Sequence, residues 1–377
     1  MREVLDALLA RWESGEPTGV GTVVATFRSA PRPAGASMLV GTDGTAVGSV
    51  SGGCVEGAVY ETAQQVIRSG TPVLHRYGVS DDDAFAVGLT CGGILDVFVE
   101  RVDRTTFPDF AELATLVRSE TAVALATVID HPDRTRVGRR RLLPAGRDAT
   151  GTLGSDRVDA AVDADAAGLL ASGIDATLSY GPDGERRGEG MRVFVWSFAP
   201  RPRMIVFGAI DFAAAVARIG TFLGYRVTVC DARPVFATRA RFPDVHDVVV
   251  DWPHRYLSGE DAAGRIDART VLAVLTHDPK FDVPLLEVAL RLPAVEYIGA
   301  MGSRRTHDDR LVRLRQAGVS EADIGKLSSP IGLDLGARTP EETAISIAAE
   351  IIAARWGGSG RPLAELRGAI HGTVTDR

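Results

Sequence analysis

The sequence has few cysteines and no long apolar run. Three cysteines among 377 residues are an odd number, which does not suit a disulfide framework. The first 15 residues follow an amphipathic helical pattern that carries Glu3 and Asp6, which is not typical of a signal peptide. No apolar run approaches the ~18 residues that a membrane span requires. We therefore expect a cytoplasmic protein in a reducing environment, with no membrane partner.

Lysine is also scarce. The basic residues are nearly all arginine, and the only lysines are Lys280 and Lys326. The formal net charge of −7 argues against nucleic acid as a partner. The arginine run at 139–141 is most simply explained as a solvated strand or turn, and phosphate binding there is the alternative.

The chain is too long for one ordinary core, and its pattern changes at the stiff segment 199–203. Before it we expect a duplicated α+β domain over residues 1–198, with halves of about 1–104 and 105–198. After it, strands alternate with helices, which predicts a Rossmann-like, doubly wound parallel sheet over residues 203–377. The predicted fold class is α/β.

The duplication rests on an offset of 103 residues. Ser69-Gly70 and Tyr77 match Ser172-Gly173 and Tyr180 at this offset, and the predicted helix 55–69 falls on 158–172. With a short insertion, the strand residues 24–26 fall near 125–127. The two halves could pair around a pseudo-twofold axis.

The segment 48–57, GSVSGGCVEG, is the hardest to explain as scaffold. It follows two strand-like runs joined by an Asp43-Gly44 turn, and a helix follows it. Gly52 and Gly53 can turn backbone N–H groups toward an anion at the helix start, where the thiolate of Cys54 is also favoured. The alternative is a tight turn with a buried cysteine. At the 103 offset the turn becomes Gly-Ser-Asp-Arg at 154–157, so its loss from one half favours a function in the other.

A second turn, Cys91-Gly92-Gly93, precedes another strand of the same half. Two such turns can meet at one end of a sheet, which would bring Cys54 and Cys91 together as candidate thiols. Incidental thiols in two glycine-rich turns are the alternative. A zinc site is disfavoured because there is no C-x-x-C pair.

The first turn of the Rossmann-like domain departs from the dinucleotide fingerprint. Gly208 fits G-x-G-x-x-G, but Ile210 stands where the second glycine belongs and Asp211 places a carboxylate at the helix start. NAD(P) in the usual pose is therefore disfavoured. Asp231 could hold a ribose hydroxyl, or it could form a local ion pair with Arg233.

Polar residues also follow the later strands of this domain. His277, Asp278, Lys280 and Asp282 come after the fourth strand, and His277 could act as an acid, a base or a ligand, or serve the structure. The run 299–305, GAMGSRR, opens a helix and could cradle an anion. Cys230 lies in an apolar strand and is expected in the core.

With these residues laid out, the chain resembles the xanthine dehydrogenase accessory protein family, XdhC/CoxI, over nearly its whole length. The similar runs include GSVSGGCVEG, Cys91-Gly92-Gly93, THDPKFD at 276–282, IGAMGSRRT at 298–306 and SPIGLDLGARTPEETAISIAAEI at 329–351. The resemblance implies a cytoplasmic maturation factor that binds molybdenum cofactor, supports its sulfuration with a cysteine desulfurase and delivers it to an apo molybdenum hydroxylase. It leaves a homodimer open.

The resemblance and the motifs together define the predicted site. Cys54, Cys91 and His277 are the candidate reactive groups, and Arg32 with the amides of Gly52 and Gly53 would lie near the pterin phosphate. The predicted cofactor-binding residues are Arg32, Ser51, Gly52, Gly53, Glu56, Gly92, Gly93, Gly208, Asp231, Arg233, Lys280, Gly299, Gly302, Ser303 and Arg304. The alternative function is an NAD(P)-linked oxidoreductase or a xanthine dehydrogenase-associated subunit.

Overall fold

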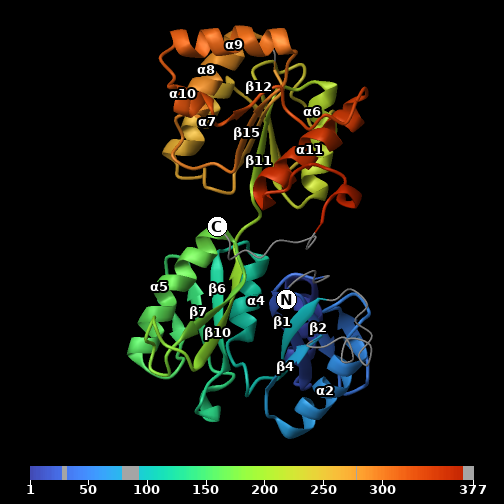
Figure 1. The fold of residues 1–377 in the computed structure, drawn as a ribbon, viewed down its shortest axis with the longest axis vertical. Coiled ribbons are helices and arrows are strands. Elements are labelled where there is room, and N and C mark those ends of the chain that lie inside the picture. The colour runs from blue at the N-terminus through green and yellow to red at the C-terminus, as the bar shows by residue number, and fades with distance from the viewer. Residues whose placement is uncertain (28–31, 79–92, 277, 368–377) are drawn as a thin grey trace. The chain divides into compact units, whose positions relative to one another are not determined.

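The computed structural model describes residues 1–27, 32–78, 93–276 and 278–367. The chain divides into two compact units, one containing Met1–Pro200 and the other Arg201–Leu366 (Figure 1). The first holds antiparallel sheets and the second a parallel sheet, so the predicted fold class is confirmed. Across the described residues, no helix combines the length and the apolar character needed to cross a membrane.

The first half of the first unit is a five-stranded antiparallel sheet of order β3-β2-β1-β5-β4 with two main helices. Apolar side chains of α1, such as Leu5, Leu8 and Leu9, are buried against this half because they recur on one helix face. The elements are η1 (Arg2–Val4), α1 (Leu5–Ser14), β1 (Thr18–Phe27), β2 (Ser37–Val40), β3 (Ala46–Gly48), α2 (Glu56–Ser69), β4 (Val73–Tyr77) and β5 (Ile94–Val102).

The second half repeats this arrangement as the sheet β8-β7-β6-β10-β9. Each strand of the second half takes the place that its counterpart has in the first. The elements are α4 (Phe110–Arg118), β6 (Val123–Asp130), η2 (Arg134–Arg136), β7 (Arg140–Pro144), β8 (Thr150–Gly151), α5 (Asp156–Ser172), β9 (Ala176–Tyr180) and β10 (Met191–Phe198).

A β-bulge at the same place in both halves fixes their alignment. The β1–β5 register shifts between Val23 and Ala25, and the β6–β10 register shifts where Val128 precedes Ile129. Val24 therefore corresponds to Ile129, and the predicted match of residues 24–26 with 125–127 is wrong. Sequence similarity misplaced the alignment of this strand because both strands are apolar and alike in sequence.

The two halves join through a shared core and a buried ion pair. Asp96 of β5 and Arg192 of β10 each precede a Val-Phe-Val run, so they are equivalent residues, and their side chains meet at 3.0 Å. Arg76 also donates to Asp96, at 2.6 and 2.8 Å. Burial opposes ionisation of Asp96, but the hydrogen bonds from both arginines keep its pKa below the usual value.

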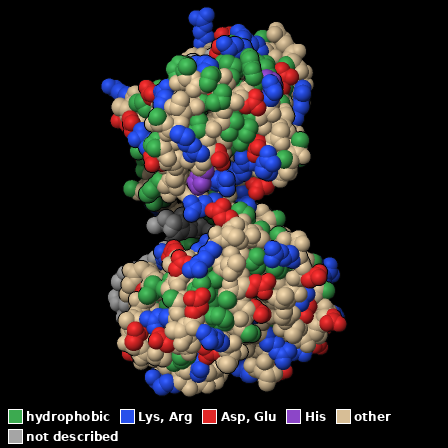
Figure 2. All heavy atoms as spheres, turned by 180° about the vertical axis from the view of Figure 1, so that it is seen from behind, with side chains coloured by type: hydrophobic (Ala, Val, Ile, Leu, Met, Phe, Trp, Pro, Cys, Tyr) green, Lys and Arg blue, Asp and Glu red, His purple; other side chains and the backbone are tan. Residues whose placement is uncertain are grey.

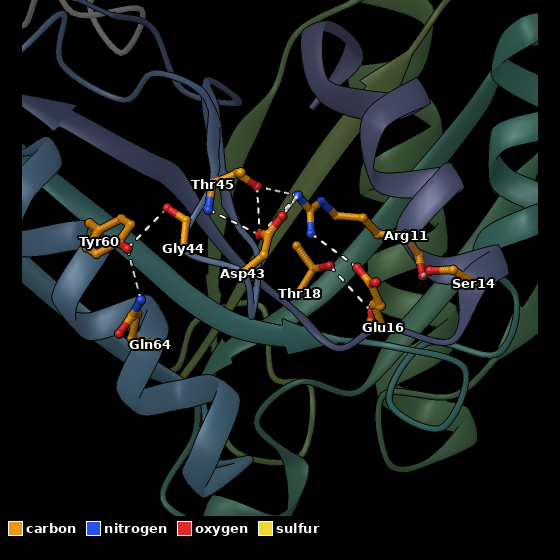
Figure 3. Close-up of polar contacts among 9 residues, drawn as sticks. All are labelled: Arg11, Ser14, Glu16, Thr18, Asp43, Gly44, Thr45, Tyr60 and Gln64. Carbon is orange, nitrogen blue, oxygen red and sulfur yellow. Dashed lines mark hydrogen bonds and ion pairs between the residues drawn. The ribbon is translucent and has the colours of Figure 1, made fainter.

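The predicted hairpin turn lies at Asp43-Gly44, where Gly44 has a φ of +82°. Figure 3 shows how both helices of this half hold the turn. Arg11 of α1 donates to Asp43 and to Thr45, and Tyr60 of α2 donates to the carbonyl of Gly44 at 3.1 Å. These contacts fix the hairpin that leads into the Cys54 turn.

The second unit is a six-stranded parallel sheet of order β13-β12-β11-β14-β15-β16. Helices α6 and α11 pack together in this unit, and α7 packs on α8 (Figure 1). The elements are β11 (Arg203–Phe207), α6 (Asp211–Phe222), β12 (Arg226–Asp231), β13 (Asp247–Val250), α7 (Pro253–Ala262), β14 (Val271–Val274), α8 (Pro279–Ala289), β15 (Tyr297–Ala300), α9 (Arg304–Gln316), α10 (Glu321–Ile324), β16 (Leu327–Ser328), α11 (Pro340–Trp356) and η3 (Leu363–Glu365).

Helices α7 and α8 both depart from a regular apolar helix pattern. Helix α7 has few buried apolar side chains, mainly Leu257, so its periodic pattern is weak. Helix α8 begins at Pro279 and continues through Pro284. Pro279 is tolerated at the first helical position because its missing N–H has no intrahelical partner there, whereas Pro284 lies inside the helix and removes one such hydrogen bond.

Charged side chains of both signs are interspersed over the face that Figure 2 shows. Many of the arginines pair with carboxylates at the surface, for example Arg118 with Asp6 and Arg315 with Glu321, each at 2.7 Å. Such exposed pairs add little to stability because water and salt screen them. Most of the arginines named in such pairs therefore contribute charge to the surface, and the buried arginines described below are the exceptions.

Candidate functional site

The Cys54 turn connects β3 to α2. Gly52 and Gly53 have φ values of +79° and +122°, which side-chain-bearing residues rarely adopt, so the turn requires glycine at both positions. Cys54 is half-buried, carries a free thiol and packs against the core between α2 and the sheet. Cys54 is therefore not the fully buried cysteine that the alternative interpretation expected.

The backbone amides of this turn converge on the carboxylate of Glu56. The amides of Ser51, Gly52 and Gly53 donate to it at 2.8, 3.0 and 2.8 Å, and that of Val50 at 3.2 Å. The hydroxyls of Ser49 and Ser51 donate at 2.6 and 2.5 Å. Burial opposes the charge, but these hydrogen bonds lower the pKa of Glu56 to about 2.

This geometry corrects the predicted role of Gly52 and Gly53. Their amides do form an anion-binding cradle, but the anion is the chain's own Glu56. Ser51 completes the turn, since its hydroxyl oxygen accepts hydrogen bonds from the amides of Cys54 and Val55 at 2.9 and 3.0 Å. Ser51, Gly52, Gly53 and Glu56 therefore shape the turn that carries Cys54.

The second half retains the carboxylate but not the glycine-cysteine turn. Asp159 lies 103 residues after Glu56 and accepts a hydrogen bond from the amide of Leu153, the counterpart of Val50, at 2.8 Å. An acidic residue at the start of this helix thus belongs to the common scaffold. What distinguishes the first half is the pair of glycines and Cys54, which Ser155, Asp156 and Arg157 replace.

Arg32 and the second predicted turn are described only in part. Arg32 is half-buried, donates to Glu3, and has a buried Nε with no hydrogen-bond partner among the described residues. Cys91 and Gly92 lie outside the described residues, while Gly93 is buried directly before β5. β5 begins at the sheet end where β1 finishes, and β3 runs toward that same end. That Cys91 meets Cys54 remains a prediction.

The first turn of the Rossmann-like unit is closed by its own side chains. Gly208 has a φ of +106°, and a side chain there would press on the backbone of Thr276. Asp231 accepts hydrogen bonds from the amides of Ala209 and Arg233 at 2.7 and 2.9 Å, and from the Arg233 guanidinium at 2.8 and 3.0 Å. Burial opposes its charge, but these bonds lower its pKa.

Asp231 and Arg233 therefore form the local ion pair that was the alternative to ribose binding. With four hydrogen bonds already made, Asp231 is not poised to accept more. Asp211 at the start of α6 is exposed and pairs with Arg241 at 3.0 Å. A negative side chain occupies the position where a dinucleotide would place its pyrophosphate.

The loops after β14 and β15 are tied together by Arg310, which the sequence did not single out. Arg310 is buried and donates to Asp282 at 3.0 Å, to the Met301 carbonyl at 2.7 Å and to Ser329 at 2.9 Å. Its place in the arginine-rich helix α9 gave no sign of burial. Asp282, one of the predicted polar residues, is therefore a structural partner.

Of the other predicted residues after β14, Lys280 lies beside a carboxylate and an aromatic ring. Lys280 pairs with Asp278 at 3.0 Å and lies 4.8 Å from the Phe281 ring centroid. The Trp252 ring, which the sequence patterns did not indicate, lies 5.2 Å from Phe281. His277 lies outside the described residues.

The predicted cradle after β15 mostly serves the fold. A side chain at Gly299 would collide with Ile331 and Tyr297, and one at Gly302 would press on Thr306. Ser303 caps α9 by accepting a hydrogen bond from the amide of Thr306 at 3.2 Å, and Arg304 is exposed. Within the part of the chain that the structure describes, no group of acidic, histidine or cysteine side chains is arranged to hold a metal ion.

Comparisons with known proteins agree with this architecture. The family model described as the XdhC Rossmann domain matches residues 204–351, and that of the XdhC and CoxI family matches residues 11–78 and 116–181. These matches lie in the parallel-sheet unit and in both halves of the duplicated unit. The chain belongs to the XdhC and CoxI family.

Two curated relatives span most of the chain. A Bacillus subtilis protein, named as a probable subunit of xanthine dehydrogenase, is 28% identical, with 93% of this chain and 96% of that protein covered. The Escherichia coli molybdenum cofactor insertion chaperone PaoD is 27% identical, with 94% and 87% covered. A Bacillus halodurans crystal structure described as a xanthine dehydrogenase shares the fold, with a TM-score of 0.67, 24% identity and 96% and 97% coverage.

Proposed function

We propose that this chain is a molybdenum cofactor insertion chaperone for a xanthine dehydrogenase-type enzyme. The name of the Escherichia coli relative supports cofactor insertion, and that of the Bacillus subtilis relative supports a connection with xanthine dehydrogenase. The observation that carries the proposal is the Cys54 turn. It presents a half-buried free thiol on a backbone fixed by six hydrogen bonds to Glu56, and only one half of the duplication has it.

The residues of the turn suit such a cargo in distinct ways. Thiolate sulfur suits soft metal centres, so Cys54 would contact the metal end of the cofactor. Arg32, with its buried unpartnered Nε, would contact the phosphate end. Glu56 is a positioning residue, because it holds the turn and leaves the amides of Gly52 and Gly53 unavailable to the cargo.

Cofactor retention tests this proposal directly. The full chain is purified from a host that makes molybdenum cofactor, and bound molybdenum and pterin are measured. Cys54→Ala should lose most of both. Cys230→Ala is the matched control, since Cys230 is buried in the sheet, and burial raises the pKa of its thiol to about 12. Equal cofactor content in Cys54→Ala and the wild type would refute the role of Cys54.

Sulfuration and delivery form the finer part of the proposal. We infer that the bound cofactor receives sulfur with the help of a cysteine desulfurase and then passes to the apo molybdenum hydroxylase. Wild-type chain loaded with cofactor should activate the apo-hydroxylase, and prior incubation with a desulfurase and cysteine should increase the activity reached. Activation that does not depend on the desulfurase would limit the function to insertion.

An NADH titration tests the competing oxidoreductase function. We expect no saturable binding, because Asp231 is already bonded to Arg233 and Ala209, and Asp211 occupies the start of α6. Saturable NADH binding by the wild type, abolished in Asp231→Ala, would favour the oxidoreductase instead.

A further inference from the structure

A pocket of about 460 Å³ lies at the junction of the two halves of the first unit. We call it the seam pocket. Its size falls within the range of small-molecule sites, ~300–1,000 Å³. Neither the Cys54 turn nor Arg32 contributes to it, so it is separate from the proposed cofactor site. The lining residues come from the first half at 70, 72 and 100–101, and from the second at 106–109, 137–140 and 151–152.

Arg140 reaches across the seam to the first half. The sequence suggested that the run 139–141 is solvated, and for Arg140 this is wrong. It donates to the Glu100 carboxylate and, at 2.7 Å, to the carbonyl of Thr106, and its guanidinium lies 4.4 Å from the Phe107 ring centroid. The Arg140 side chain is nine-tenths buried. Its Nε has no hydrogen-bond partner among the described residues, which leaves a buried donor unsatisfied.

Arg139, unlike Arg140, has no side-chain partner in the described part of the fold. Its side chain is exposed and makes no hydrogen bond or ion pair within the described part of the chain. Arg101, the third lining arginine, is bonded to Asp103 at 2.5 Å. The one lining carboxylate besides Glu100 is Asp109, which precedes α4, where the helix dipole partly offsets its charge.

The first half builds the same strand without these cations. The amide of Val23 donates to the carbonyl of Ala36, and the amide of its counterpart Val128 donates to that of Arg139. Arg139 therefore takes the place of Ala36, and by the same register Arg140 takes that of Ser37. Because this strand folds with alanine and serine, the Arg139 guanidinium is not a requirement of the fold.

We propose that the seam pocket binds a small molecule that carries a phosphate or similar oxyanion on an apolar body. Arg139, the exposed arginine of the lining, binds the oxyanion, since guanidinium groups bind such anions through charge-assisted hydrogen bonds. Pro72, Pro108 and Val137 line the wall for the apolar body. Asp109 lowers the affinity for any ligand of high negative charge.

The test compares 1-naphthyl phosphate with 1-naphthol, two fluorescent probes that differ in the phosphate group. With the full chain, 1-naphthyl phosphate should bind at least about tenfold more tightly than 1-naphthol. Arg139→Ala should raise the dissociation constant for the phosphate about tenfold. Arg139→Lys should retain part of it, and Asp109→Asn should bind more tightly than the wild type.

The controls separate this site from the rest of the chain. Arg147→Ala makes the same charge change in an exposed loop outside the pocket and should leave the affinity unchanged. Cys54→Ala should bind the probe as the wild type does, so failure of the cofactor proposal would not affect this one. Equal affinity for the two probes, or unchanged phosphate affinity in a folded Arg139→Ala chain, would overturn the proposal.

Discussion

The two halves of the first unit share a fold and differ in chemistry. The first has the glycine-cysteine turn and has Ala36 and Ser37 at the strand positions where the second, which lost the turn, has Arg139 and Arg140. Both retain the bulge, the strand order and an acidic residue at the start of the second helix. Features kept in both halves serve the fold, and features found in one half are the candidates for function.

The largest expected effect lies where the halves meet. Asp96→Ala would leave Arg192 and Arg76 without their buried partner, and breaking a buried pair typically costs about 3–5 kcal/mol. Both arginines are partly exposed, so we expect the lower end of that range in urea unfolding. Asp6→Ala, which breaks an exposed pair with Arg118, should cost no more than about 1 kcal/mol. Similar costs for the two variants would show that Asp96 does not join the halves.

A glycine kept in both halves provides the next comparison. Gly48 and Gly151 have φ values of +86° and +80°, and a side chain at either would collide with the carbonyl of the facing strand. Gly48→Ala and Gly151→Ala should each cost roughly 2–3 kcal/mol in unfolding free energy. Gly52→Ala, with a positive φ but open space around it, should cost roughly 1–2 kcal/mol. A larger loss at Gly52 than at Gly48 would contradict this order.

The Glu56 carboxylate predicts a pH dependence. Its folded pKa of about 2 lies below the ordinary value of 4.5, so its stabilisation is present above pH 4.5 and is lost as the pH falls toward 2. Glu56→Gln removes the charge that the turn amides bind and should cost about 1–2 kcal/mol at pH 7. The difference between wild type and variant should shrink on acidification. A difference that stays constant from pH 7 to pH 2.5 would show that the charge is not what the amides stabilise.

The smallest expected effect on stability is at Cys54. Cys54→Ala removes one half-buried sulfur and should lower the unfolding free energy by less than about 1 kcal/mol. Its counterpart in the second half, Arg157→Ala, should also change stability little, since Arg157 is exposed. Only Cys54→Ala should lose bound molybdenum, so the pair separates function from fold. Loss of molybdenum in Arg157→Ala would contradict the assignment of the site to the first half.

The sequence predicted the elements whose residues are spaced regularly. The 103-residue offset predicted the duplication because α2 and α5 end in the same Ser-Gly pair and lead to equivalent strands. The alignment of β6 with β1 was wrong by four residues, because a bulge and a changed loop length leave no mark in apolar strands. The helix α7 was missed because it has little apolar periodicity.

The site was predicted less well, for a physical reason. The sequence indicated that the amides of Gly52 and Gly53 bind an anion, and it named Glu56 among the binding residues. It did not show that these amides bind the Glu56 carboxylate itself. The run at 139–141 gave no sign that Arg141 pairs with Asp163 at 2.6 Å or that Arg140 crosses to Glu100. Hydrogen-bond partners are decided within about 3 Å, which residue spacing does not resolve.

By itself, the sequence determined the α/β class, the duplicated unit and the parallel sheet, because periodicity and turn residues set local structure and its repetition. Only the tertiary structure decided that Glu56 fills the amide cradle, that Asp231 is bonded to Arg233, and that Asp96 meets Arg192. These pairings depend on which of several competing groups lies within hydrogen-bond distance of a donor in the folded chain. That outcome is set by packing and register.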